Sequence, residues 1–189
     1  AVLNDAPPVD AWICAGDVVG YYPDVNDVCV MLLGLRASVI RGNHDGYVCR
    51  ALTPNQDRMV AYRTQWTQDH LESRHARWIG SLPVEMVFAF GQRRLRVRHA
   101  SPWDEETYLY PDSNCFPDIQ LAPNEYLLLG HTHHPMRVAA GEGHIINPGS
   151  VGQPRDYNPA ASYAILDVES GAVEHRRATY DVASYQATL

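Results

Sequence analysis

Four short polar clusters hold the residue types in this chain that could do chemistry, and each follows a strand-like run of residues. Asp17 lies in Gly-Asp-Val-Val-Gly, and residues 42–45 read Gly-Asn-His-Asp. His99 opens His-Ala-Ser-Pro, and residues 130–133 read Gly-His-Thr-His. Carboxylate, amide and imidazole ligands together favour manganese, iron or zinc over calcium. The clusters therefore predict a metal site, and an aspartate able to bridge suggests two ions about 3.5–4 Å apart.

Each cluster also has a plain structural interpretation. The Asp17 segment could be a simple turn, residues 42–45 a loop with an Asx turn and a helix cap, and His99 a structural histidine. The repetition of polar groups after apolar runs favours chemistry over coincidence. In residues 130–133, an extended chain would place His131 and His133 on the same side, a spacing that suits a metal better than a core.

The elements that must position these clusters follow from the hydrophobic pattern. Runs at 11–15 and 37–41 predict short buried strands, and residues 25–35 between them predict a helix with Gly34 as its C-cap. This order is the βαβ pattern, whose loops at the carboxyl ends of the strands carry chemistry. Residues 57–82 predict a polar helical region, and strand-like runs follow at 84–90, 93–99, 126–129, 135–140, 144–147, 162–168 and 172–180. We expect one α/β domain over residues 1–189, with two sheets and helices outside.

Composition and charge exclude several classes of protein. The 189 residues carry a net charge of −7, which argues against a general nucleic-acid binder, so we expect nucleic acid as a partner solely in the form of a small or cyclic nucleotide. All 15 basic residues are arginine, and the absence of lysine rules out Schiff-base chemistry and Walker-type phosphate loops. No apolar run approaches the roughly 20 residues of a membrane helix. The four scattered cysteines suggest free thiols in the cytoplasm.

Arginines at alternate positions line one face of the strand predicted at residues 93–99. Arg94, Arg96 and Arg98 would lie on the same side of this strand. A contact with nucleic acid is conceivable, but an exposed strand face with solvated charges is the more ordinary interpretation.

The ordered set of Gly-Asp-x-x-Gly, Gly-Asn-His-Asp, His before Ser-Pro, and Gly-His-Thr-His resembles the calcineurin-like metallophosphoesterase superfamily. Residues 147–155, Asn-Pro-Gly-Ser-Val-Gly-Gln-Pro-Arg, resemble its small prokaryotic phosphodiesterase branch. The resemblance extends from about residue 17 to residue 166. It implies a sandwich of two mixed sheets flanked by helices, with a dinuclear metal centre at the strand ends.

The resemblance assigns metal ligands position by position. Asp17 matches the ligand that bridges both ions. Asn43, His99 and His131 match ligands of the second ion, and His133 matches a ligand of the first. The expected ions are divalent manganese, with iron, zinc or nickel as alternatives.

The resemblance also assigns residues that act on the substrate. His44 matches the histidine that stabilises the transition state or protonates the leaving oxygen, with Asp45 as the partner of its imidazole. Arg41 and Arg155 are candidates for bidentate binding of phosphate oxygens. A structural or surface role is an equal alternative for each of them. The remaining histidines are expected at structural or surface positions: His70, His75, His134, His144 and His175.

One part of the family pattern is absent. The family opens with a strand ending in Asp-x-His, which supplies two ligands of the first ion, and no such motif precedes Asp17. Either this chain lacks its first strand or its metal site is degenerate. We expect the first explanation, which leaves the first metal site incomplete.

The resulting expectation is a metal-dependent phosphodiesterase in which metal-activated water hydrolyses a small phosphodiester. A phosphomonoesterase or a nucleotide polyphosphate hydrolase is an alternative within enzymes. A protein-binding scaffold is an alternative of another class, because a eukaryotic retromer subunit resembles this branch. His44 favours the enzyme, since a scaffold has no evident need for a proton donor. We expect no membrane partner, and the chain could form a homo-oligomer.

Overall fold

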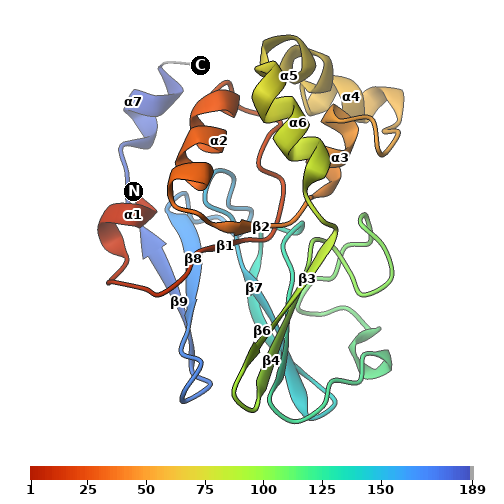
Figure 1. The fold of residues 1–189 in the computed structure, drawn as a ribbon, viewed down its shortest axis with the longest axis vertical. Helices are drawn as coiled ribbons and strands as arrows, with labels where there is room; N and C mark the ends of the chain where they lie inside the picture. Colours follow the sequence, from red (N-terminus) through yellow and green to blue (C-terminus); the bar gives the residue numbers. More distant parts are fainter. Residues whose placement is uncertain (188–189) are drawn as a thin grey trace. The chain divides into compact units, whose positions relative to one another are not determined.

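The computed structural model describes residues 1–187, which separate into two compact units (Figure 1). The first unit consists of residues 1–8 and 85–187, and the second unit consists of residues 9–84. Each unit has a hydrophobic cluster of its own. In the described part of the chain, no helix is both long enough and apolar enough to cross a membrane.

The second unit contains the predicted βαβ arrangement. Strands β1 (Ile13–Cys14) and β2 (Ser38–Val39) pair in parallel, and helix α2 (Val25–Gly34) connects them. Both strands are shorter than the apolar runs that predict them. The prediction that Gly34 caps α2 is wrong, because Gly34 is the last helical residue and the left-handed conformation falls on Arg36, at φ 51°.

Four short helices complete the second unit. They are α3 (Asn43–Val48), α4 (Gln56–Ala61), α5 (Thr64–His70) and α6 (Ser73–Ser81). The helical region predicted at residues 57–82 is therefore divided, because Arg63 is left-handed at φ 49° and Leu71 is extended. Both conformations interrupt the hydrogen bonds from each N–H to the carbonyl four residues earlier. The breaks allow Leu71 and Ile79 to join the buried cluster around Val39.

The first unit is built on a five-stranded mixed sheet. Its strands are β3 (Glu85–Phe90), β4 (Arg93–Arg98), β5 (Glu125–Leu128), β6 (Pro135–Ala140) and β7 (Gly143–Pro148), in the order β3-β4-β5-β7-β6. The three central strands run parallel, and the edge strands β3 and β6 are antiparallel to their neighbours. The chain after β4 and the chain after β5 therefore leave the same edge of the sheet.

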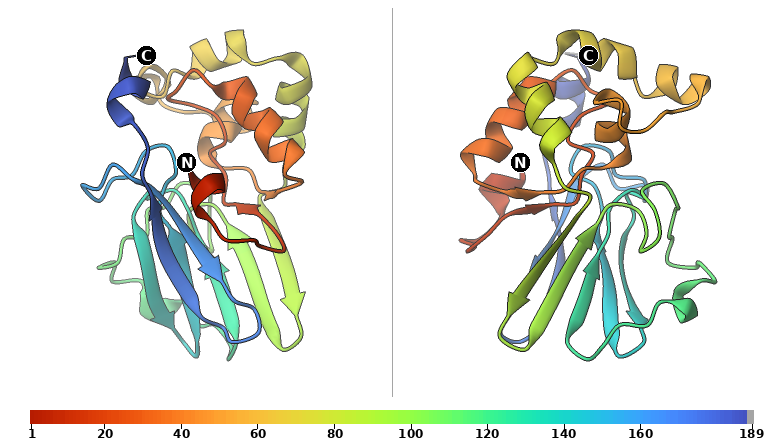
Figure 2. Two further views of the ribbon diagram at one scale, coloured as in Figure 1. Left: turned by 90° about the vertical axis from the view of Figure 1, so that its left-hand side faces the viewer. Right: turned by 45° about the vertical axis from the view of Figure 1, so that its right-hand side comes forward.

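The two faces of this sheet are covered by different segments. The hairpin of β8 (Ala161–Leu166) and β9 (Val173–Ala178) lies over one face, where the Tyr126 hydroxyl donates to the Gly171 carbonyl at 3.1 Å (Figure 2). The next residue, Leu127, belongs to the opposite face and packs with Phe116 of the 3₁₀ helix η1 (Phe116–Asp118). Two short terminal helices, α1 (Val2–Asp5) and α7 (Val182–Gln186), complete the unit.

The predicted α/β class with a mixed sheet is confirmed. The run at 135–140 matches β6, and the other strand boundaries differ from prediction by one or two residues at most ends. Outside the five-stranded sheet, the described strands form two separate pairs, β1–β2 and β8–β9. The organisation of the chain as a single domain stays a prediction.

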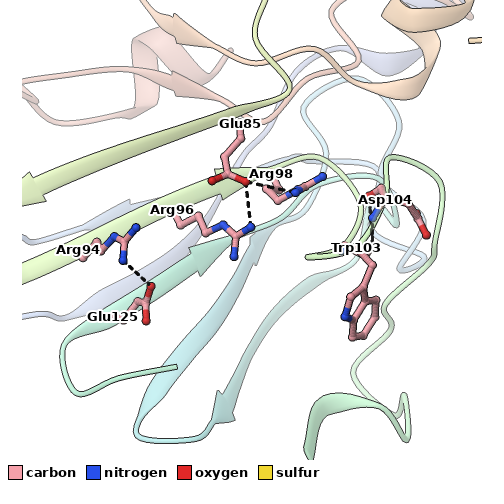
Figure 3. Close-up of polar contacts among 8 residues, drawn as sticks. Glu85, Arg94, Arg96, Arg98, Trp103, Asp104 and Glu125 are labelled. Atoms are coloured by element: carbon pink, nitrogen blue, oxygen red, sulfur yellow. Dashed lines mark hydrogen bonds and ion pairs between the residues drawn. The ribbon is translucent and has the colours of Figure 1, made fainter. Parts of the chain in front are cut away.

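The arginine face of β4 is an ion-paired surface (Figure 3). Arg96 and Arg98 both reach the Glu85 carboxylate, at 2.9 and 3.2 Å, and Arg94 lies 3.7 Å from Glu125. These pairs follow from register, because Glu85 stands opposite Arg98 on β3 and Glu125 stands opposite Arg94 on β5. The two carboxylates thus offset part of the charge of the three arginines along the sheet.

Candidate active site

In the second unit, Asp17 is bound to the start of α3. Asp17 follows β1 at φ 55°, a left-handed conformation that aspartate tolerates better than most residues. The backbone N–H of His44 donates to Asp17 Oδ1 at 3.0 Å. A Cβ added to Gly42 would lie 2.8 Å from Asp17 Cγ and closer still to two other Asp17 atoms. A glycine at position 42 therefore permits the close approach of the two loops.

Asp45 joins the same two loops through backbone hydrogen bonds. Its carboxylate accepts the N–H of Gly42 at 2.9 Å and the N–H of Val19 at 3.1 Å, and the residue is fully buried. Burial and then the Asp17 carboxylate together raise the pKa of Asp45 to about 7, against the opposing effect of the backbone N–H groups. The partnership of Asp45 with the His44 imidazole stays a prediction. As the third residue of α3, Asp45 accepts the N–H of Gly42, the residue before the helix, and so caps the helix N-terminus.

Asn43 is held so that its oxygen is the atom suited to a metal. Its Nδ2 donates to the Tyr47 hydroxyl at 3.2 Å, and both residues are buried. An amide whose nitrogen is engaged as a donor presents Oδ1 as its ligand atom. The position fits the neutral oxygen ligand expected at Asn43.

Three tyrosines surround the imidazole of His44, and sequence reasoning missed them. The ring centroid of His44 lies 4.1 Å from that of Tyr62, 4.6 Å from that of Tyr21 and 5.9 Å from that of Tyr47. The signal in the sequence was weak: Tyr21 adjoins the Asp17 segment, whereas Tyr62 lies in a helical region with no polar motif.

In the first unit, His99 and His131 lie together at one edge of the sheet. His99 directly follows β4, and His131 follows β5 after two residues. Because these strands are parallel and Val97 pairs with Leu128, their carboxyl ends coincide. The two buried rings meet edge to face, with centroids 5.1 Å apart. The sheet thus brings together two of the predicted ligands.

The reasoning from strand alternation at His131 and His133 is wrong. Both residues lie beyond the end of β5, in left-handed conformations at φ 61° and φ 60°, so neither belongs to an extended chain. Each ring is nevertheless held by a hydrogen bond to a backbone carbonyl. His131 Nε2 donates to the Glu106 carbonyl at 3.0 Å, and His133 Nδ1 donates to the Gln153 carbonyl at 2.7 Å.

These two hydrogen bonds fix which nitrogen of each ring could bind a metal. A carbonyl oxygen can accept a hydrogen bond but cannot donate one. The ring nitrogen that contacts it therefore carries the proton, and the other ring nitrogen carries the lone pair. The lone pair is on Nδ1 in His131 and on Nε2 in His133. Histidines that bind metals almost always donate their other ring N–H in this way. The arrangement therefore fits a divalent metal.

Asn147 supports this histidine loop, and sequence reasoning did not assign it a role. Its Nδ2 donates to the Gly130 carbonyl at 2.6 Å and to Thr132 Oγ1 at 3.0 Å. Its Oδ1 accepts the N–H of Gly149 at 2.9 Å, and the residue is fully buried. The available signal was the Asn-Pro-Gly-Ser segment that begins at this residue.

The two arginines suggested for phosphate binding occupy half-buried positions. The backbone N–H of Arg41 donates to the Pro83 carbonyl at 2.7 Å, which places Arg41 immediately before the α3 cluster in the second unit. Arg155 lies on the loop of the first unit that holds His133, where its Nη2 donates to Gln153 Oε1 at 3.1 Å. Their role toward phosphate stays a prediction.

Comparison with known proteins gives consistent results. The model of the calcineurin-like phosphoesterase superfamily domain matches residues 1–171. An uncharacterized protein of Methanocaldococcus jannaschii is 30% identical over 203 residues, covering 96% of this chain and 82% of that protein. The crystal structure of a metallophosphoesterase from Sphaerobacter thermophilus is 30% identical with a TM-score of 0.78, covering 99% of this chain and 84% of that one. The crystal structure of a hypothetical protein from Pyrococcus horikoshii has the same fold, with a TM-score of 0.79. It is 18% identical in sequence, and the match covers 99% of this chain and 82% of that one.

The match to the family model takes in all four polar clusters, including the buried histidines of the first unit and the Asp17 and α3 cluster of the second. The fold agrees as well, since the mixed α/β architecture is that of the structural relatives. The chain belongs to the calcineurin-like phosphoesterase superfamily.

Proposed function

We propose that this chain is a metal-dependent phosphodiesterase that hydrolyses a small phosphodiester. Family membership supports hydrolysis of a phosphate ester. The preference for a diester rests on the resemblance of residues 147–155 to the small prokaryotic phosphodiesterase branch. The expected metal is divalent manganese, bound by Asp17, Asn43, His99, His131 and His133.

The observation that carries the proposal is the state of the histidine loop. His131 and His133 each donate one ring N–H to a backbone carbonyl, so each has its lone pair on a defined nitrogen. Histidines that bind metals almost always donate their other ring N–H in this way, so the arrangement suits metal binding. Asn147 adds a buried support that keeps the loop in place.

The residues divide the chemistry between them. Bound divalent ions would supply Lewis acidity, activating water and neutralising charge on the phosphoryl oxygens. His44 donates a proton to the leaving oxygen, which is worth roughly 10²–10⁴-fold in rate for general acid catalysis. Arg41 and Arg155 hold phosphate oxygens through paired N–H groups. Asp45 connects the loop of Asp17 to the loop of His44 by accepting the N–H groups of Val19 and Gly42.

A pair of chromogenic substrates tests the proposal. The full chain, supplied with manganese, is assayed with bis(4-nitrophenyl) phosphate and with 4-nitrophenyl phosphate. We expect a higher kcat/KM for the diester. A tenfold or greater preference for the monoester would contradict the proposal and favour a phosphatase. Absence of hydrolysis by protein that holds both metal ions would favour the scaffold.

Two histidine variants connect the activity to the proposed ligands. His131→Ala should lower both the bound manganese and the diesterase rate, because it removes a ligand. His70→Ala is the matched control. His70 is an exposed histidine whose ring, like that of His131, bonds a backbone carbonyl: its Nδ1 lies 2.8 Å from the Trp66 carbonyl oxygen. Equal metal content and equal activity in the two variants would contradict the assignment of His131.

A further inference from the structure

We infer that Tyr21 and Tyr62 form a subsite beside His44 for a planar leaving group, and that this group is a nucleoside. The inference rests on the proposed function, because it takes His44 as the residue that protonates the leaving oxygen. It adds the chemical class of the group that departs.

The two tyrosine rings lie against the imidazole from different parts of the second unit. Tyr62 is at the C-terminal end of α4, with its ring centroid 4.1 Å from that of His44. Tyr21 is in the loop after β1, at 4.6 Å from His44, and meets Tyr62 edge to face at 5.3 Å. The backbone N–H of Tyr21 donates to the Tyr62 carbonyl at 3.3 Å, which ties the two segments together.

Tyr47, the third ring around His44, is more deeply buried than the other two. Tyr47 is 2% exposed, and its hydroxyl accepts the Asn43 amide, so Tyr47 belongs to the packing beneath the site. His44 is 4% exposed, whereas Tyr21 and Tyr62 are half-buried. The accessible surface of this cluster is therefore mainly tyrosine, and a group that approaches His44 would meet these two side chains.

The loop that carries Tyr21 is pressed against the imidazole. Gly20 has φ 109°, and a Cβ there would lie 2.7 Å from His44 Nδ1. Tyr21 itself has φ 61°, an uncommon conformation for a bulky residue. Such conformations cost free energy and concentrate at functional sites. Here the backbone conformation is what places an aromatic ring beside His44.

The chemistry of the step selects the group that these rings would contact. General acid catalysis requires the leaving oxygen within hydrogen-bond reach of the imidazole. The remainder of the leaving group must then extend along the neighbouring surface, which is aromatic. Stacking on an aromatic side chain suits any nucleobase, because every base has a π-face. A leaving group without an aromatic ring, such as a sugar or an alkyl alcohol, would lose this stacking contact.

A pair of substrates with the same leaving oxygen isolates the stacking. One is a methyl phosphodiester of the thymidine 5′-hydroxyl, and the other carries the same deoxyribose without its base. The acidity of the leaving alcohol is closely matched, so a difference in kcat/KM reports contacts to the base. For the manganese-loaded protein we expect the thymidine ester to be favoured by about tenfold, within the range of stacking contributions.

Tyrosine variants test where that preference originates. Tyr21→Leu and Tyr62→Leu should each lower the ratio of the two kcat/KM values severalfold, whereas Tyr21→Phe and Tyr62→Phe should retain it. Tyr180→Leu is the matched control, because Tyr180 is an exposed tyrosine of the first unit. Thymidine should also inhibit the wild-type protein competitively, and should do so less in the leucine variants.

The outcomes separate this inference from the proposed function. A wild-type ratio near one, or a ratio that the leucine variants leave unchanged, would overturn the subsite while leaving the diesterase intact. Hydrolysis of neither ester by metal-loaded protein, with thymidine binding also absent, would overturn both. Thymidine binding that depends on Tyr21 and Tyr62 in a protein without diesterase activity would support the subsite and contradict the proposed reaction.

Discussion

Gly42→Ala should disrupt the contact between Asp17 and the start of α3. Gly42 has φ −93° and ψ 177°, so alanine could adopt its backbone conformation without strain. The obstacle is steric, because the new Cβ would overlap the backbone nitrogen and the carboxylate of Asp17. A backbone atom cannot rotate away as a flexible side chain could. The loops that carry Asp17 and His44 must therefore separate.

The size of the effect follows from two opposing contributions. Overpacking of a buried position costs about 1–3 kcal/mol. Replacing glycine with alanine restricts the unfolded chain, which returns about 0.4–1 kcal/mol. We expect a net loss of roughly 1–2 kcal/mol in the free energy of unfolding, measured by urea denaturation with circular dichroism. Manganese affinity should also fall by about 10–100-fold, as it does when the support of a ligand is removed.

Gly34→Ala is the control for this experiment. Gly34 lies in α2, and a Cβ there would meet no other atom of the described residues within 4 Å. Alanine should stabilise the helix by up to about 1 kcal/mol, because glycine loses more conformational freedom on folding. If Gly42→Ala proved as stable as Gly34→Ala and bound manganese like the wild type, the steric argument would be refuted.

Three further predictions concern single side chains. His44→Ala should reduce turnover by about 10²–10⁴-fold while bound metal, measured by elemental analysis, is retained; loss of the metal would show that His44 is a ligand. Burial raises the pKa of the Cys29 thiol to about 12, so the thiol should be alkylated in denaturant and protected from alkylation in the native protein. Mass spectrometry measures both alkylation rates, and equal rates in the two states would contradict the burial of Cys29. Burial and then the Arg137 guanidinium lower the pKa of His144 below 6.5, so the unfolded state binds more protons and stability falls as the pH drops below 6.5. NMR titration of Arg137→Gln should show a raised His144 pKa, and an unchanged value would exclude the charge effect.

Much of the fold was predictable because its physical causes are local. The apolar runs before Asp17 and before residues 42–45 identified β1 and β2, and their parallel pairing followed from the helix between them. The meeting of His99 and His131 follows from the same rule, since parallel strands end at one edge of a sheet. The register that pairs Arg98 with Glu85 was not deduced in advance, because it depends on the position of the turn between β3 and β4.

The parts that could not be predicted depend on backbone conformation and on contacts between distant segments. Asp17, His131 and His133 all have positive φ, and hydrophobic periodicity carries no information about such residues. The role of Asp45 became clear once the Val19 N–H was found within reach of its carboxylate. Tyr62 approaches His44 from a separate helix, so no motif could connect them.

Removal and return of metal tests the central claim most directly. The full chain is stripped with a chelator, its metal content is measured, and hydrolysis of bis(4-nitrophenyl) phosphate is followed as manganese is added back. We predict that the stripped protein is inactive and that the diesterase rate rises with bound manganese until the site is filled, in the wild type and not in His131→Ala. Hydrolysis by the stripped protein at the rate of the manganese-loaded protein would contradict the account.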